Sequence, residues 1–295
     1  MFAETWQTVL EAEEAARSGA PVERCLGALR QIAFADFAEL MFSLPREELP
    51  ALSATLPRMA AVEDQRFWTG AHGHELLKQT VPFVRGLAHA YAERGGSIRE
   101  ARVLDFGCGY GRHLRLMSYF VDPERLYGCD PWPPSLERCR RDRVFGHLAE
   151  SDPLPSELPF SGEFDLIYAF SVFTHLSAHA MRQNLKVLRE RLRRGGLLAI
   201  TIYPVEYWVD DAVCEADRLR MQEEHRRCGF AFLPLEKPSV TDQGEVGDGR
   251  TADGEVTFGR TTMTVEDLLS ACPQFRLVGL DRALEDPYQS VVYLS

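Results

Sequence analysis

The sequence has little positive charge, no long apolar run and no secretion signal. Its 44 acidic residues outnumber its 33 basic residues, for a formal net charge of −11. Such a chain is not expected to present the basic face that nucleic-acid binding needs. No apolar run is long enough to cross a bilayer, and the acidic, alanine-rich start lacks the basic and apolar regions of a signal peptide. We therefore expect a cytoplasmic protein with neither a nucleic acid nor a membrane as its partner.

The sequence also lacks paired cysteines. Its seven cysteines are scattered, and no two form a C-x-x-C pair. The sequence therefore lacks the usual signals of a zinc site or a redox pair. By default, its cysteines are expected to stay reduced, as in a reducing compartment. His72 and His74 stand close together, but no carboxylate or cysteine is clearly placed to complete a metal site. We expect no metal.

Two parts of the chain differ in pattern. Residues 2–18 have helical periodicity, and the apolar spacing from Val22 to Leu40 predicts further helix. Prolines then divide the chain into short pieces. We interpret residues 1–65 as an α-helical cap, which could cover apolar surface, form a homodimer or provide one wall of an acceptor site. Residues 66–295 form the main domain in this interpretation.

One glycine-rich stretch in the main domain carries most of the chemical information. Val103 and Leu104 are expected to end a buried strand, and Gly107, Gly109 and Gly111 follow in a tight turn before a helix. Glycine is needed where φ is positive or where a ligand approaches the backbone. The stretch has no Gly-Lys-Ser/Thr, and its spacing is G-x-G-x-G instead of G-x-G-x-x-G. It is therefore neither a Walker A loop nor a dinucleotide fingerprint.

A second carboxylate follows at the end of the next expected strand, residues 126–130. Asp130 in that position could accept two hydrogen bonds from the hydroxyls of a ribose. The alternative is a turn aspartate, which the neighbouring Pro131 would favour. Because the glycine turn lies upstream, we favour the ribose role.

The rest of the chain alternates strands and helices. Ser177 is a candidate N-cap for the helix after the fourth strand, and Thr264 opens a later helix with a capping box. Short connections favour an antiparallel pair at the C-terminus. The sequence predicts a doubly wound α/β fold with a mostly parallel seven-stranded sheet and an antiparallel last strand. The remaining strands are expected within 147–152, which includes the strand's exit, and at 164–170, 197–203, 275–280 and 290–294.

The glycine stretch and the fourth strand together resemble a known family. Val-Leu-Asp-Phe-Gly-Cys-Gly-Tyr-Gly at 103–111, and Ser-Val-Phe-Thr-His-Leu at 171–176 after a Phe-Asp-Leu-Ile strand, are similar to motifs of class I (Rossmann-like) S-adenosylmethionine (SAM) dependent methyltransferases of bacterial type. The resemblance implies SAM as cofactor and S-adenosylhomocysteine (SAH) as product. The cofactor-binding residues that it implies are Asp105, Gly107, Cys108, Gly109, Asp130, Pro131, Ser151, Asp152, Phe170 and Ser171.

Two residues are the main candidates for a catalytic role. His175 follows the fourth strand, where the acceptor is expected to approach, and histidine suits proton removal near neutral pH. A purely structural role for His175 is equally open. Tyr203, at the tip of the fifth strand, is a rival candidate. His113 is a weaker rival, because its place in the first turn after the glycine loop favours packing on the cofactor side. The resemblance also implies a lid over the cofactor at residues 66–75, and the aromatic-flanked insertion 204–262 is a candidate lid over the acceptor.

The expected activity is methyl transfer to an oxygen or nitrogen of a small-molecule acceptor, with sugars and secondary metabolites among the candidates. One alternative is a methyltransferase acting on protein or RNA. The acidic charge and the absence of Asn/Asp-Pro-Pro-Tyr/Phe after the fourth strand count against it. Another is a non-catalytic SAM-binding subunit, and the intact glycines and both aspartates count against that.

Overall fold

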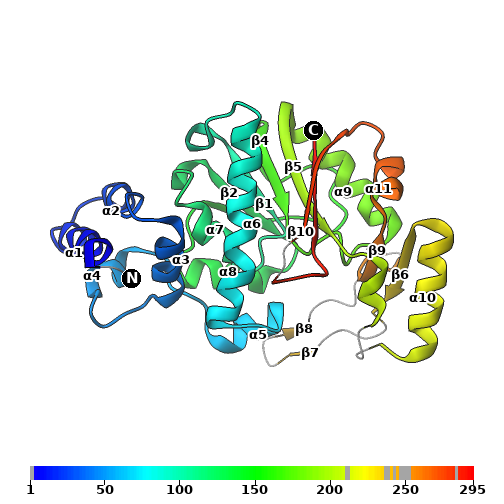
Figure 1. Cartoon of the computed structure of the whole chain (residues 1–295), viewed down its shortest axis with the longest axis horizontal. Helices are drawn as coiled ribbons and strands as arrows, with labels where there is room; N and C mark the ends of the chain where they lie inside the picture. Colours follow the sequence, from blue (N-terminus) through cyan, green and yellow to red (C-terminus); the bar gives the residue numbers. More distant parts are fainter. Residues whose placement is uncertain (1–2, 210–212, 236–239, 242–243, 246–253, 283–284) are drawn as a thin grey trace. The chain divides into compact units, whose positions relative to one another are not determined.

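The structure is a computed structural model of the 295-residue chain (Figure 1). It divides into two compact units, residues 1–128 with 135–148 and residues 129–134 with 149–295. Among the described residues, no helix is long and apolar enough to span a membrane. The described residues are 3–209, 213–235, 240–241, 244–245, 254–282 and 285–295.

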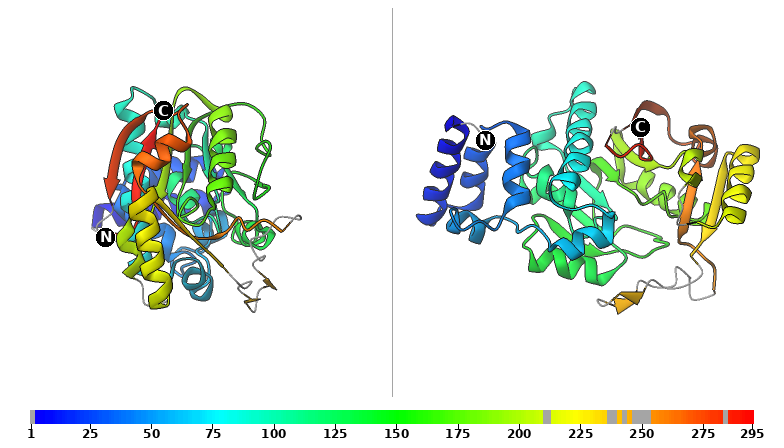
Figure 2. Two further views of the ribbon diagram at one scale, coloured as in Figure 1. Left: turned by 90° about the vertical axis from the view of Figure 1, so that its right-hand side faces the viewer. Right: turned by 60° about the horizontal axis from the view of Figure 1, so that its bottom comes forward.

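The first unit begins with five helices, as the periodicity of residues 1–65 predicts. Helix α1 packs against α2 and α4, and α3 packs against α6 (Figure 2). The helix expected from Val22 to Leu40 is interrupted after Leu29. At the break, the Arg30 guanidinium donates to the carbonyls of Ser118 and Val121 and pairs with the Asp122 carboxylate. The five helices are α1 (Ala3–Arg17), α2 (Val22–Leu29), α3 (Phe34–Ser43), α4 (Pro50–Thr55) and α5 (Val62–Thr69).

The remainder of the first unit starts the α/β core. Helix α6 begins at Gly73, directly after the segment that contains His72. The other elements follow the predicted alternation, and two short 3-10 turns, at Ile98–Glu100 and Pro123–Arg125, precede β1 and β2. They are α6 (Gly73–Glu93), β1 (Val103–Phe106), α7 (Arg112–Met117), β2 (Leu126–Asp130), α8 (Pro133–Arg141) and β3 (His147–Glu150).

Seven strands form one sheet in the order β10-β11-β5-β4-β1-β2-β3. Strand β4 (Phe164–Ala169) pairs in parallel with β5 (Leu192–Ile202), whereas β11 (Ser290–Leu294) is antiparallel to both β5 and β10 (Leu277–Arg282). The predicted mostly parallel sheet with one reversed strand is confirmed. Every residue of β1 and β4 is buried, which explains why their sequences are almost continuously apolar.

The connection from β4 to β5 differs from expectation in one detail. Helix α9 (Ala178–Arg191) begins where Ser177 Oγ accepts the Ala180 amide, so the predicted N-cap is confirmed. At its other end the chain enters β5 directly at Leu192, before the strand start expected at 197, so Gly195 and Gly196 lie within the strand. Gly196 serves close packing: an added Cβ would lie 2.9 Å from the Arg193 and Asp165 carbonyl oxygens.

The insertion between β5 and β10 has ordered structure of its own. Strands β6 (Phe230–Pro234) and β9 (Gly259–Met263) form an antiparallel pair with α10 (Glu215–Cys228) alongside (Figure 2). Trp208, in a short 3-10 helix at Val205–Val209, is fully buried beside Met221 and Ala231. The other elements are β7 (Val240–Thr241), β8 (Gly244–Glu245) and α11 (Val265–Ala271), which Thr264 caps as predicted. Most of the polar loop expected at 241–254 lies outside the described residues.

Candidate functional site

In the first unit, the glycine loop follows directly from β1. Asp105 is 1% exposed at the strand's end. Gly107, Gly109 and Gly111 have φ values of 76°, 53° and 75°, so each occupies the left-handed region that disfavours other residues. The three glycines are therefore required by the backbone, as the sequence predicts. Cys108 is buried with its thiol toward Gly128, so a ligand could meet only its backbone.

A tryptophan from the expected lid lies against this loop. Trp68 belongs to α5, and a Cβ added at Gly109 would be 2.9 Å from its indole nitrogen. Its ring meets that of Tyr110 edge-on, with 5.7 Å between centroids, and the Arg138 guanidinium lies 5.0 Å from its centroid. The segment 66–75 is thus largely helical, and its aromatic side chain reaches the glycine loop.

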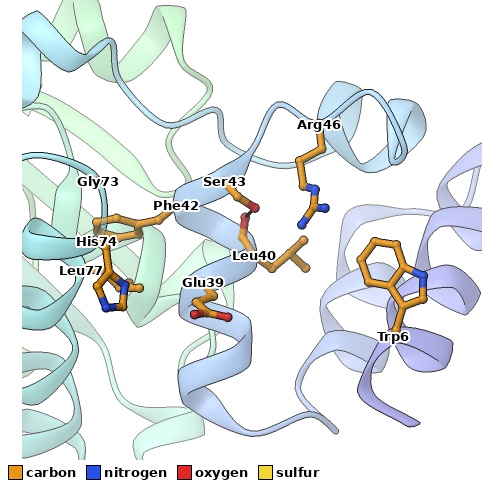
Figure 3. A pocket seen from close by; sticks show the side chains of 9 residues that line it. All are labelled: Trp6, Glu39, Leu40, Phe42, Ser43, Arg46, Gly73, His74 and Leu77. Carbon is orange, nitrogen blue, oxygen red and sulfur yellow. Dashed lines mark hydrogen bonds between the residues drawn. The ribbon is translucent and has the colours of Figure 1, made fainter. Parts of the chain in front are cut away.

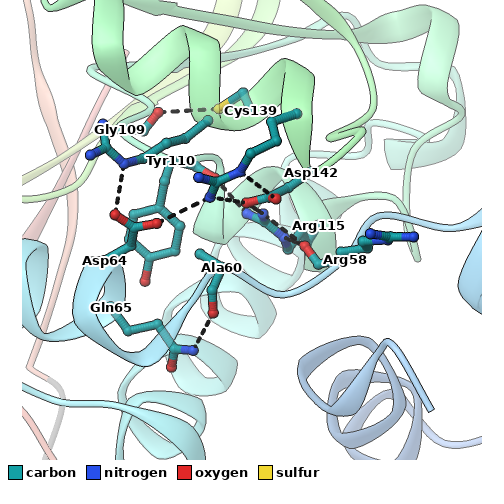
Figure 4. A network of polar contacts seen from close by, with 11 residues as sticks. Arg58, Ala60, Asp64, Gln65, Gly109, Tyr110, Arg115, Cys139 and Asp142 are labelled. Carbon is teal, nitrogen blue, oxygen red and sulfur yellow. Dashed lines mark hydrogen bonds and ion pairs between the residues drawn. The ribbon is translucent and has the colours of Figure 1, made fainter. Parts of the chain in front are cut away.

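Buried ion pairs fix α5 and the loop to α8 (Figure 4). The Asp64 carboxylate accepts hydrogen bonds from Arg138 at 2.8 Å and from Arg141 at 3.1 Å. Arg115, which is fully buried, donates to the Arg58 carbonyl, and the Cys139 thiol donates to the Gly109 carbonyl. Removing a charged side chain from water costs free energy, and this cost is compensated only when the charge is paired and hydrogen-bonded. The network therefore joins the end of the cap to the glycine loop.

A cavity of about 550 Å³ opens elsewhere in the first unit, among α1, α3 and the start of α6 (Figure 3). Leu40 and Leu77 contribute apolar surface, and Glu39, Arg46 and His74 contribute polar groups. None of the residues that the sequence predicts for the cofactor lines this cavity. We therefore assign it to the cap.

In the second unit, Asp130 and Ser151 lie together, as expected for neighbouring strand ends. The Ser151 amide donates to the Asp130 carbonyl at 3.2 Å, and both residues are buried. Asp130 Oδ1 accepts the Trp132 amide at 2.9 Å, so the turn role that the sequence leaves open is present. Pro131 is exposed. Asp152 is also exposed, and its Oδ1 accepts the Leu154 amide.

Ser171 occupies an unusual backbone position just after β4. Its φ is 57°, in the region that non-glycine residues rarely adopt, and such strain concentrates at functional sites. Its amide donates to Thr201 Oγ1 at 2.7 Å, and its hydroxyl accepts the Gln289 side-chain amide at 3.2 Å. Phe170, immediately before it, is partly exposed. The end of β4 is thus held from β5 and from the loop before β11.

His175 is oriented by the insertion. Its Nδ1 lies 2.8 Å from the Gly259 carbonyl oxygen, and its ring stacks on Phe258 with 5.0 Å between centroids. Because a carbonyl only accepts, Nδ1 carries the proton, and Nε2 keeps the lone pair. Desolvation lowers the pKa of His175 below its ordinary value, and the charge of Arg260 adds to the effect. A neutral imidazole with a free Nε2 lone pair is the form that a general base requires.

Tyr203, in contrast to His175, is a group that keeps its proton. Desolvation raises the pKa of its phenol to about 12, so the group stays protonated near neutral pH. Its ring stacks on Tyr207 at 4.0 Å between centroids, and its hydroxyl accepts the Gln289 side-chain amide at 3.3 Å. Tyr203 is thus suited to donate a hydrogen bond, and His175 to remove a proton.

Sequence reasoning did not identify Phe258, Gly259 or Gln289. Gly259 is required because an added Cβ would lie within 2.9 Å of both the Leu233 carbonyl oxygen and Pro234. These residues belong to no motif, and each lies more than 80 positions from its partner at the end of β4. Only the aromatic content of the insertion and the Tyr288-Gln289 pair ahead of the last strand give a weak signal.

Comparison with known proteins agrees with these features. Residues 103–196 match the family model for a methyltransferase domain. A search of curated proteins finds no match. A crystal structure of a SAM-dependent methyltransferase from Clostridium acetobutylicum ATCC 824 has a TM-score of 0.51 and 11% identity, covering 79% of this chain and 96% of that chain. This likeness shows a shared fold.

Two other similar structures have lower TM-scores. Magnesium protoporphyrin IX methyltransferase (ChlM) from Synechocystis PCC 6803 has a TM-score of 0.47 and 11% identity, over 78% of this chain and 91% of that chain. The glycopeptide N-methyltransferase MtfA has a TM-score of 0.45 and 15% identity, over 72% and 90%. The family match over residues 103–196, the glycine loop and the seven-stranded sheet together support a class I SAM-dependent methyltransferase.

Proposed function

We propose that this chain transfers the methyl group of SAM to an oxygen or nitrogen of a small-molecule acceptor and releases SAH. The observation that carries the proposal is the state of His175: a neutral imidazole, with its proton held at Nδ1, that follows the strand end where the family motif lies. A general base is useful when the acceptor loses a proton as it is methylated. The acidic net charge also favours a small molecule over a nucleic acid.

The cofactor residues are assigned within each unit. In the first unit, Gly107, Cys108 and Gly109 offer backbone to the methionine portion of SAM, and Asp105 orders the loop or meets the amino group. In the second unit, Asp130 takes the ribose hydroxyls, with Pro131 shaping its turn. Ser151 or Asp152 binds the adenine amine, and Phe170 and Ser171 face the cofactor. The positive-φ glycines and the strained Ser171 support these assignments.

The chain's own contribution to the reaction is binding, orientation and proton removal. SAM supplies an electrophilic methyl group on a sulfonium centre. The protein holds the acceptor at near-attack distance, excludes water and accepts a proton at His175 Nε2. The insertion 204–262 is proposed to cover the acceptor, because its Phe258 and Gly259 already orient His175.

Three finer features belong to the same proposal. Residues 1–65 are the cap and residues 66–295 the catalytic domain, and a homodimer forms through the cap. The protein works in a reducing cytoplasm, which the seven free cysteines support. Light scattering of the full chain would test the dimer, and a monomer at micromolar concentration would contradict it.

Calorimetry with SAH and a turnover assay with labelled SAM test the central proposal. We expect SAH to bind and label to pass to a small-molecule metabolite extract. Label in added protein or RNA would instead indicate a macromolecular methyltransferase. SAH binding without turnover on any of the three would indicate a non-catalytic subunit.

A further inference from the structure

An aromatic cluster gathers in the second unit around the two candidate catalytic residues. Tyr203 stacks on Tyr207, Tyr207 meets Tyr288 edge-on at 5.9 Å between centroids, and His175 meets Tyr203 edge-on at 6.4 Å. We call these residues, with Phe258, the aromatic cluster. All five are partly exposed. They offer ring faces and edges on which another ring can pack.

Gln289 is hydrogen-bonded to Tyr203 of the cluster, and its side-chain oxygen can accept a further hydrogen bond. It is 3% exposed, and its amide nitrogen donates to both Ser171 Oγ and Tyr203 Oη. Its Oε1 has no hydrogen-bond partner among the residues that the structure describes. A buried carbonyl left in this state is costly, so a partner that donates a hydrogen bond is expected there.

The polar groups of this region are neutral. Tyr203 stays a phenol, Thr174 and Ser171 contribute hydroxyls to its hydrogen bonds, and His175 is uncharged. Two nearby charges act on the cluster with opposite sign: Asp286 raises the pKa of Tyr203, and Arg260 lowers that of His175. Because these two charges have opposite sign, the region has no net charge that would favour a cation or an anion over a neutral ligand.

Resting on the methyl transfer proposed above, we propose that the acceptor is an uncharged ring bearing at least two hydroxyl groups and is methylated on oxygen. Its ring packs on the partly exposed tyrosines. One hydroxyl donates to Gln289 Oε1, and the other gives its proton to His175 Nε2. An amine acceptor would arrive as an ammonium ion, which a region without net charge does not favour over a neutral ring.

The transfer step balances without a further reactant. The acceptor oxygen forms a bond to the methyl carbon, the bond between that carbon and the sulfonium sulfur breaks, and its electron pair stays on sulfur. The hydroxyl proton passes to His175 Nε2. Gln289 holds the acceptor without touching the reacting atoms, so it is a positioning residue.

Ligand-observed NMR on the full chain with saturating SAH tests this inference. The probes are catechol, methyl glucopyranoside, benzylamine and benzoate, which separate an aromatic diol, a sugar, a cation and an anion. We expect at least one of the two hydroxylated rings to bind, and both charged rings to bind about tenfold more weakly or not at all, a difference of about 1.4 kcal/mol.

Two variants locate the binding. Gln289→Met removes the amide at similar length, and Tyr207→Leu removes a ring. Each should weaken the hydroxylated probe by about tenfold. Tyr127→Leu removes a partly exposed tyrosine of the first unit and should change nothing. Thermal unfolding identifies a variant that does not fold, in which case the other variant decides.

The outcomes separate this inference from the proposed function. If SAH binds but benzylamine or benzoate binds as well as the hydroxylated rings, the acceptor class is wrong while methyl transfer stands. The acceptor class is also wrong, while methyl transfer stands, if neither hydroxylated ring binds. It is equally wrong if both variants bind the hydroxylated ring as tightly as the wild type does. Failure of SAH itself to bind would instead remove the proposed function.

Discussion

At the scale of single residues, the chemistry of His175 depends on one backbone carbonyl. Gly259 accepts the Nδ1 proton, which leaves Nε2 as the basic nitrogen, and desolvation keeps the ring neutral. The same desolvation raises the pKa of Tyr203 to about 12 and removes it as a base. Desolvation thus leaves His175 neutral and able to accept a proton, while it keeps the proton on Tyr203.

The His175→Ala variant tests the base. We expect kcat to fall by roughly 10²–10⁴, the usual contribution of a general base, while SAH affinity in calorimetry stays unchanged. In the wild-type enzyme the rate should decline only as pH falls through the lowered pKa of His175, below 6.5, because protonation then occupies Nε2. Near-normal turnover of the variant would make His175 a structural residue.

Asp130 combines a turn role with a proposed ribose contact, and two substitutions separate them. Asp130→Ala should weaken SAM binding by about 1–3 kcal/mol, as expected when a charged acceptor is lost. Asp130→Asn keeps an oxygen for the Trp132 amide and should have an intermediate effect. Asp217→Ala, on α10, serves as control. Unchanged calorimetric affinity in folded Asp130→Ala would remove the ribose assignment.

At the scale of elements, α5 connects the cap to the cofactor loop. Its Asp64 is held by two arginines of α8, and its Trp68 lies against Gly109. A ligand on the glycine loop would therefore meet the indole, and the left-handed Gly70 that ends α5 provides a place for the backbone to turn. Position and hinge together suggest that this helix responds to the cofactor.

Hydrogen exchange of residues 66–75 tests that response. We expect protection to rise when SAH is added, since the aromatic side chains close over the ligand. Asp64→Asn should raise exchange of α5 without ligand, because it leaves the buried Arg138 without its full counter-charge. Equal protection of the wild-type segment with and without SAH would contradict the lid.

At the scale of the whole molecule, histidines with lowered pKa values link stability to pH. Desolvation and the charge of Arg112 hold the pKa of His113 well below 6.5, and desolvation also lowers the pKa of His175 and His225. The unfolded chain therefore binds more protons than the native one between these lowered values and about 6.5. Stability therefore rises with pH across that window, and this contribution is lost as pH falls through it.

Urea unfolding at pH 7.5 and pH 5.5 measures this linkage. His113→Gln should reduce the loss of stability on acidification, by up to about 1.4 kcal/mol per pH unit, the slope for one proton. His89→Gln, an exposed change on α6, should leave the pH dependence as in the wild type. An identical pH dependence in His113→Gln would show that this histidine does not contribute.

The sequence alone determined the order of strands and helices, the reversed last strand and the glycine loop. These follow from local rules: buried parallel strands are continuously apolar, Ser177 and Thr264 begin helices with a side-chain oxygen, and positive φ requires glycine. The motif at 103–111 also carried the resemblance to SAM-dependent methyltransferases, and its spacing excluded a Walker A loop and a dinucleotide fingerprint.

Only the tertiary structure decided which side chains surround the candidate base. Gly259 and Gln289 reach the end of β4 from positions 84 and 118 residues away, and no local pattern encodes such pairings. Likewise, only the fold brings Arg30, at the break between α2 and α3, to the distant carbonyls of Ser118 and Val121. The protonation states of His175 and Tyr203 also depend on the fold. Desolvation is set by neighbours that the fold brings together, and the adjacent sequence does not specify those neighbours.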